Sequence, residues 1–72
     1  MSTAINLLAA ARRANPGRPE GVASYPTPNG AVVVQWSRIT RTYEVGTEAM
    51  VKARGQRADV LPVLKRLMGE EP

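Results

Sequence analysis

Apolar residues recur at helical spacing near the start of the chain. The stretch from Thr3 to Ala14 is rich in alanine and leucine, and its apolar side chains fall on one stripe of a helix. A hydroxyl from Ser2 or Thr3 is expected to cap the first turn. Residues 15–17, which read Asn-Pro-Gly, predict the end of this helix, because asparagine and glycine tolerate left-handed backbone and proline cannot continue a helix.

A second helical pattern lies near the other end of the sequence. From Asp59 to Met68 one apolar face is formed by Val60, Val63, Leu64, Leu67 and Met68. We expect Asp59 to cap this helix and Pro62 to lie in its first turn, where a missing N–H is harmless. Gly69 predicts the end of the helix, and residues 70–72 form an acidic tail.

The middle of the chain has the short-period pattern of strands. Asn29-Gly30 is the strongest turn signal, and a β-branched run over 31–36 follows it. Residues 39–45 alternate between two faces, so the two segments are predicted to pair as antiparallel strands around a turn at Ser37-Arg38. Residues 48–54 fit either a third strand or two turns of helix, and their alternation favours the strand.

Residues 16–30 interrupt these patterns with four prolines and three glycines. We expect a functional or mobile loop here, in which residues 22–25 add at most a short edge strand. The predicted fold is α+β, a single small domain over 1–72 in the order helix, loop, three antiparallel strands, helix (αβββα). Both helices would pack on one face of the sheet and leave the other face to water or a partner.

Composition removes most enzyme chemistry. The chain has no cysteine and no histidine, so it offers no thiolate nucleophile, imidazole base or His/Cys metal site. Glu44 and Glu48 flank a turn, but nearby basic side chains predict salt bridges across the strands rather than acid–base catalysis. The amino terminus lacks the features of a signal peptide, and no apolar run approaches the ~20 residues of a bilayer span, so we expect a cytoplasmic protein without a membrane partner.

The charge and the aromatic residues supply the candidate binding site. Ten basic residues, eight of them arginine, outnumber six acidic ones, yet the only adjacent basic pairs are Arg12-Arg13 and Lys65-Arg66. Aromatic and arginine side chains are enriched both at protein interfaces and where nucleic-acid bases stack. The alternative for Trp36 and Tyr43 is that they face the helices as core. The candidate partner-binding residues are Trp36, Arg38, Arg41, Tyr43, Tyr25, Arg12 and Arg13.

The predicted order of elements resembles the topology of the double-stranded-RNA-binding domain. That family carries a lysine-rich cluster at the start of its last helix, which clamps phosphates across a groove. The corresponding stretch here, residues 55–60, has one arginine close to an aspartate. The resemblance is therefore one of element order, and it implies no binding residues for this chain.

These observations lead us to expect a non-enzymatic binding protein that regulates or inhibits a larger macromolecular partner through a protein–protein interface. Small arginine- and alanine-rich proteins of this kind resemble bacteriophage and mobile-element products that take over a host machine. The alternative function is a basic nucleic-acid-binding module that uses the sheet face. A homodimer is a third option, because a thin core gains burial from a second copy. No cofactor or metal is expected.

Overall fold

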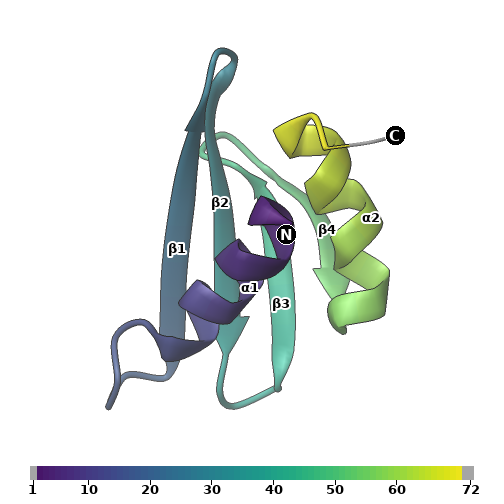
Figure 1. Ribbon diagram of the computed structural model, residues 1–72. Coiled ribbons are helices and arrows are strands. Elements are labelled where there is room, and N and C mark those ends of the chain that lie inside the picture. Colours follow the sequence, from purple (N-terminus) through teal and green to yellow (C-terminus); the bar gives the residue numbers. More distant parts are fainter. Residues whose placement is uncertain (1, 71–72) are drawn as a thin grey trace.

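Two helices and a four-stranded sheet form two layers in the computed structural model, which describes residues 2–70 (Figure 1). Both helices cover the same face of the sheet, with α1 against β1 and β2 and with α2 mainly against β3 and β4. The strands are antiparallel and lie in the order β1-β2-β3-β4. The opposite face, which we call the open face, carries no helix from the described part of the chain. The elements are α1 (Thr3–Arg13), β1 (Glu20–Thr27), β2 (Gly30–Ser37), β3 (Thr42–Thr47), β4 (Val51–Gly55) and α2 (Arg57–Met68).

The α+β class is confirmed, but the sheet has four strands rather than three. The segment predicted as a loop contains β1, which pairs with β2 along its whole length. Its inward positions near α1 are Gly21 and Ala23, and a Cβ at Gly21 would overlap the carbonyl oxygen of Ala11. Small residues therefore let the helix approach this strand closely. Pro26 is tolerated because β1 is an edge strand.

The connections between the strands follow the turn signals with some shifts. Pro28 and Asn29 join β1 to β2, and Gly30 takes a φ of 112°. The β2–β3 turn spans residues 38–41, so Ile39 and Arg41 lie in the turn and not in the predicted strand. Residues 51–55 form β4, which confirms the strand interpretation of this segment over the helical one.

Both helices end as their sequences indicate, whereas α2 begins earlier than predicted. Ser2 caps α1, since its Oγ accepts a hydrogen bond from the Ile5 N–H. Gln56 is the N-cap of α2, so Asp59 lies in the first turn, where its carboxylate accepts a hydrogen bond from the Gln56 N–H at 2.9 Å. Pro62 consequently falls inside the helix and not in its first turn. Gly69 ends α2 in left-handed backbone, as expected.

The core lies between the helices and the inward face of the sheet. Leu64 is fully buried, and Leu67 is partly buried beside it. The two large rings of the central strands also belong to this core. The buried residues are Ala4, Leu7, Leu8, Ala11, Val32, Val34, Trp36, Tyr43, Val45, Val60 and Leu64.

Candidate functional site

Six of the eight arginines lie at one end of the molecule. This end, at the bottom of Figure 1, brings together the last turn of α1, the α1–β1 loop, the β2–β3 turn and the start of α2. Main-chain contacts hold these segments together, because the Arg38 N–H donates to the Pro19 carbonyl and the Gln56 side chain donates to the Arg41 carbonyl at 3.2 Å. We call this surface the arginine end, and its residues are Arg12, Arg13, Arg18, Arg38, Arg41 and Arg57.

The arginine end carries a large uncompensated positive charge. Its neighbouring carboxylates are Glu20, at the start of β1, and Asp59, whose side chain accepts a hydrogen bond from the Gln56 N–H. Six arginines against two carboxylates give a formal charge of +4, which equals the formal net charge of the whole chain. Within residues 2–70 none of the six makes an ion pair, and the salt bridge of this region joins Arg54 to Glu44 instead. The folded chain therefore concentrates charge that is dispersed in the sequence.

Arg38 organises this end through hydrogen bonds to the main chain. Its guanidinium donates to four carbonyl oxygens at the end of α1 and in the following loop, at distances of 2.7–3.4 Å. The last carbonyls of a helix lack partners within the helix and carry the negative end of its dipole, so a cation is favourable there. The planar fork of arginine suits several acceptors at once. Arg38 is thus a positioning residue, and the acceptors are the carbonyls of Arg12, Ala14, Asn15 and Arg18.

Arg12 and the two rings Trp36 and Tyr43 stack on one another at this end of the core. The Arg12 guanidinium carbon is 4.5 Å from the centre of the Trp36 ring, a cation–π contact. Trp36 in turn packs on Tyr43, with ring centroids 4.6 Å apart. Trp36 is 6% exposed and Tyr43 4% exposed, so both rings lie in the core, and Arg12 lies over the ring of Trp36. The two aromatic candidates therefore do not present open ring faces to a partner.

The other predicted residues divide between the two ends. Arg13 and Arg41 are exposed at the arginine end, and Arg41 has a φ of 59° in the turn. Tyr25 is 40% exposed but lies toward the β1–β2 turn, opposite Val32 and away from the arginines. Sequence reasoning did not select Arg18 and Arg57. The only signal for them was their place next to element boundaries, which meet in space once the sheet order is known.

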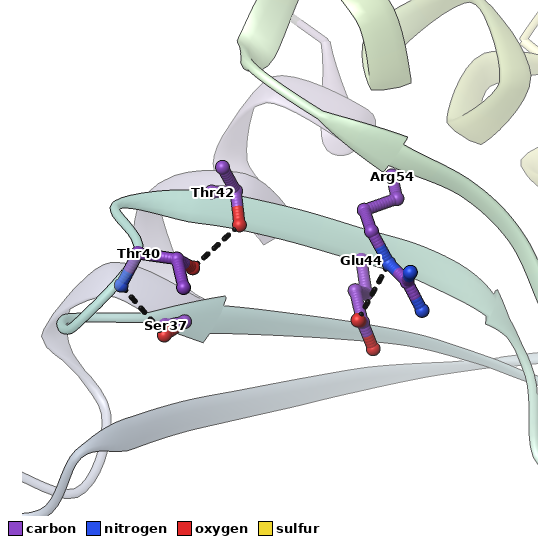
Figure 2. A network of polar contacts seen from close by, with 5 residues as sticks. All are labelled: Ser37, Thr40, Thr42, Glu44 and Arg54. Atoms are coloured by element: carbon purple, nitrogen blue, oxygen red, sulfur yellow. Dashed lines mark hydrogen bonds and ion pairs between the residues drawn. The ribbon is translucent and has the colours of Figure 1, made fainter.

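The open face has a shallow hollow with different chemistry. Its volume is about 290 Å³, and six of its eight lining residues have hydroxyl, amide or carboxylate side chains. Figure 2 shows Ser37, Thr40 and Thr42 grouped at the β2–β3 turn, with Arg54 reaching from β4 to Glu44. The Arg54 Nε lies 2.8 Å from Glu44, which confirms a salt bridge between these strands. Ile39, at the rim, is 79% exposed, the highest value among the exposed large hydrophobic residues.

Two kinds of feature are absent from the described residues. Residues 2–70 contain no group of three or more acidic side chains arranged to hold a metal ion. Within the same residues, neither helix is both long and apolar enough to cross a bilayer. No protein-family model, curated protein or solved structure significantly matches this chain.

Proposed function

We propose that this protein is a non-enzymatic module that binds nucleic acid through the arginine end. The supporting observation is the concentration of six arginines, without ion pairs, on segments that are fixed to one another. Such a surface suits a polyanion, because each phosphate contact releases condensed counterions and arginine matches phosphate oxygens with two parallel donors. The cytoplasm, expected from the sequence, would be the place of this activity.

The arginines would have different tasks in such a complex. Arg13, Arg18, Arg41 and Arg57 are exposed and would contact phosphates. Arg38 already donates to four carbonyls, so it would hold the contact residues in place. The open face suits phosphates less well, because Glu20 and Glu44 line its hollow. We therefore assign binding to the end of the sheet and not to the face considered from the sequence.

Salt dependence of binding tests this proposal. With four phosphate contacts, a plot of log affinity against log salt for duplex DNA should have a slope of about −3 to −4. Changing Arg13, Arg18, Arg41 and Arg57 to glutamine together should remove most of that slope. A control, Lys52→Gln with Lys65→Gln, removes two positive charges away from this end and should change the slope little. An equal loss of slope per charge removed in the two variants would mean that binding follows net charge alone and would contradict the assigned surface.

A regulatory protein partner is the second candidate function, and Ile39 is the observation that favours it. A large apolar side chain at the rim of a hollow is a common anchor for protein interfaces. If a protein docks there, Ile39→Ser should weaken its binding without changing stability, because the side chain is mostly exposed. Ile39 lies in the same turn as Arg41, but the variant removes no positive charge, so the salt slope of nucleic-acid binding should not change. A reduced slope in Ile39→Ser would show that the turn itself is disturbed and would count against Ile39 as a separate protein anchor.

A further inference from the structure

We infer that the arginine end binds a duplex, contacting phosphates of both strands across a groove, in preference to a single strand. This inference rests on the proposed function and specifies the class of nucleic acid. It comes from two independent features of the fold: the spread of the arginines along the end of the sheet, and the positions of the three aromatic rings.

The arginines extend across the full width of the sheet. Arg18 lies two residues before β1, Arg41 lies in the turn between the two central strands, and Arg57 lies two residues after β4. Three inter-strand spacings of 4.7–4.9 Å separate the first and last strands by about 14 Å. The major groove of B-form DNA is about 12 Å wide between its two walls, and long arginine side chains reach beyond the ends of the strands that carry them. Cations on the two edges of the sheet can thus face different strands of one duplex.

The aromatic residues are placed unfavourably for single-strand recognition. Proteins that hold single strands without sequence preference stack successive bases on exposed aromatic rings. This chain has three aromatic residues, and two of them, Trp36 and Tyr43, are buried in the core. The third, Tyr25, pairs with Val32 toward the β1–β2 turn. No ring at the arginine end is therefore available to an unpaired base, and the inner side of the Arg12 guanidinium already rests on Trp36.

The test compares how many phosphates the protein engages on each kind of nucleic acid. Labelled duplex DNA, duplex RNA and an oligothymidylate single strand, each about 20 nucleotides per strand, are titrated by fluorescence anisotropy over a range of salt concentrations. Dividing the slope by about 0.9 for a DNA duplex and 0.7 for a single strand converts it to phosphate contacts, which corrects for charge density. We expect about four contacts on a duplex, about two on the single strand, and at least tenfold tighter binding to the preferred duplex. The two duplex arms show whether the B form or the A form is bound.

Two edge variants sharpen the comparison. Arg18→Gln and Arg57→Gln should each lower the duplex slope by about one unit, and the double variant by about two. Lys52→Gln is the matched control, with no expected change, and circular dichroism checks that each variant folds. As many contacts on the single strand as on either duplex would overturn this inference while leaving the proposed function in place. No saturable binding to any of the three nucleic acids at about 50 mM salt would overturn the proposed function itself.

Discussion

The two ends of α1 are both capped by a charged side chain from a distant part of the sequence, but the two caps leave different surfaces. At the start of the helix the Glu70 carboxylate accepts hydrogen bonds from the Ala4 N–H and the Ser2 hydroxyl, each at 2.8 Å. At its other end the Arg38 guanidinium donates to the Arg12 and Ala14 carbonyls. Each charge matches the helix dipole at its end.

The difference lies in what surrounds each cap. Glu70 is a single carboxylate, and each of its two oxygens already accepts one of these hydrogen bonds. Arg38 likewise donates from both of its terminal nitrogens, yet it is accompanied by exposed arginines that have no carboxylate partner within residues 2–70. The negative charge at the start of α1 is therefore accounted for by the stabilisation of that helix. The arginine end carries more positive charge than the capping of α1 requires. That surplus is the physical reason to look for a polyanion at the arginine end.

A core substitution should cause the largest loss in the free energy of unfolding, and the losses from the two caps can be compared with it. Leu64 is a fully buried residue of α2, so Leu64→Ala should lower the free energy of unfolding by about 2–5 kcal/mol. Thermal unfolding followed by circular dichroism measures this loss. An unchanged melting temperature would show that α2 is not anchored in the core, and then the position of Arg57 at the arginine end would no longer be secure.

Removing the Arg38 cap should have the next largest effect. Arg38→Ala loses four charge-assisted hydrogen bonds to partly exposed carbonyls and should cost about 2–3 kcal/mol. Arg38→Lys keeps the charge but not the planar fork, so we expect about half of that loss. Urea denaturation distinguishes the two variants. If lysine restored full stability, the role of Arg38 would be that of a simple charge and not of a clamp.

The Glu70 cap should matter less. Glu70→Gln keeps an acceptor oxygen but removes the charge that faces the start of α1, so the expected cost is about 0.5–1 kcal/mol. The same variant should leave nucleic-acid affinity nearly unchanged, since the Glu70 hydrogen bonds lie at the opposite end of α1 from the arginines. A large loss of nucleic-acid affinity in Glu70→Gln would show that the start of α1 also takes part in binding, and this would contradict the assignment of binding to the arginine end.

Local patterns predicted the elements that depend on their own residues. The valine run of β2, the cap and stop signals of α1 and the glycine that ends α2 act within a few residues of one another. The extent of strand β1 was underestimated, with only a short edge strand at residues 22–25 expected, because its inward positions, Gly21 and Ala23, have no apolar pattern of their own. They are suited to a strand only because α1 packs closely against them.

The candidate site depended even more on tertiary structure. Trp36 and Arg38 are two residues apart in sequence, yet one ring is buried and the neighbouring guanidinium caps a helix that ends more than 20 residues earlier. Neither role has a local signature. The gathering of Arg18 and Arg57 follows from the order of the strands, which sequence spacing alone does not give.

Mapping the contact surface by nuclear magnetic resonance tests the central claim most directly. Backbone amide shifts of the labelled protein are recorded while a short duplex is added at low salt. We expect the largest changes on residues 12–19, 38–41 and 55–57, with little change at the β1–β2 turn or around Glu70. Changes centred on the open-face strand residues Val33 and Glu44, or spread evenly over the surface, would contradict the assignment of binding to the arginine end.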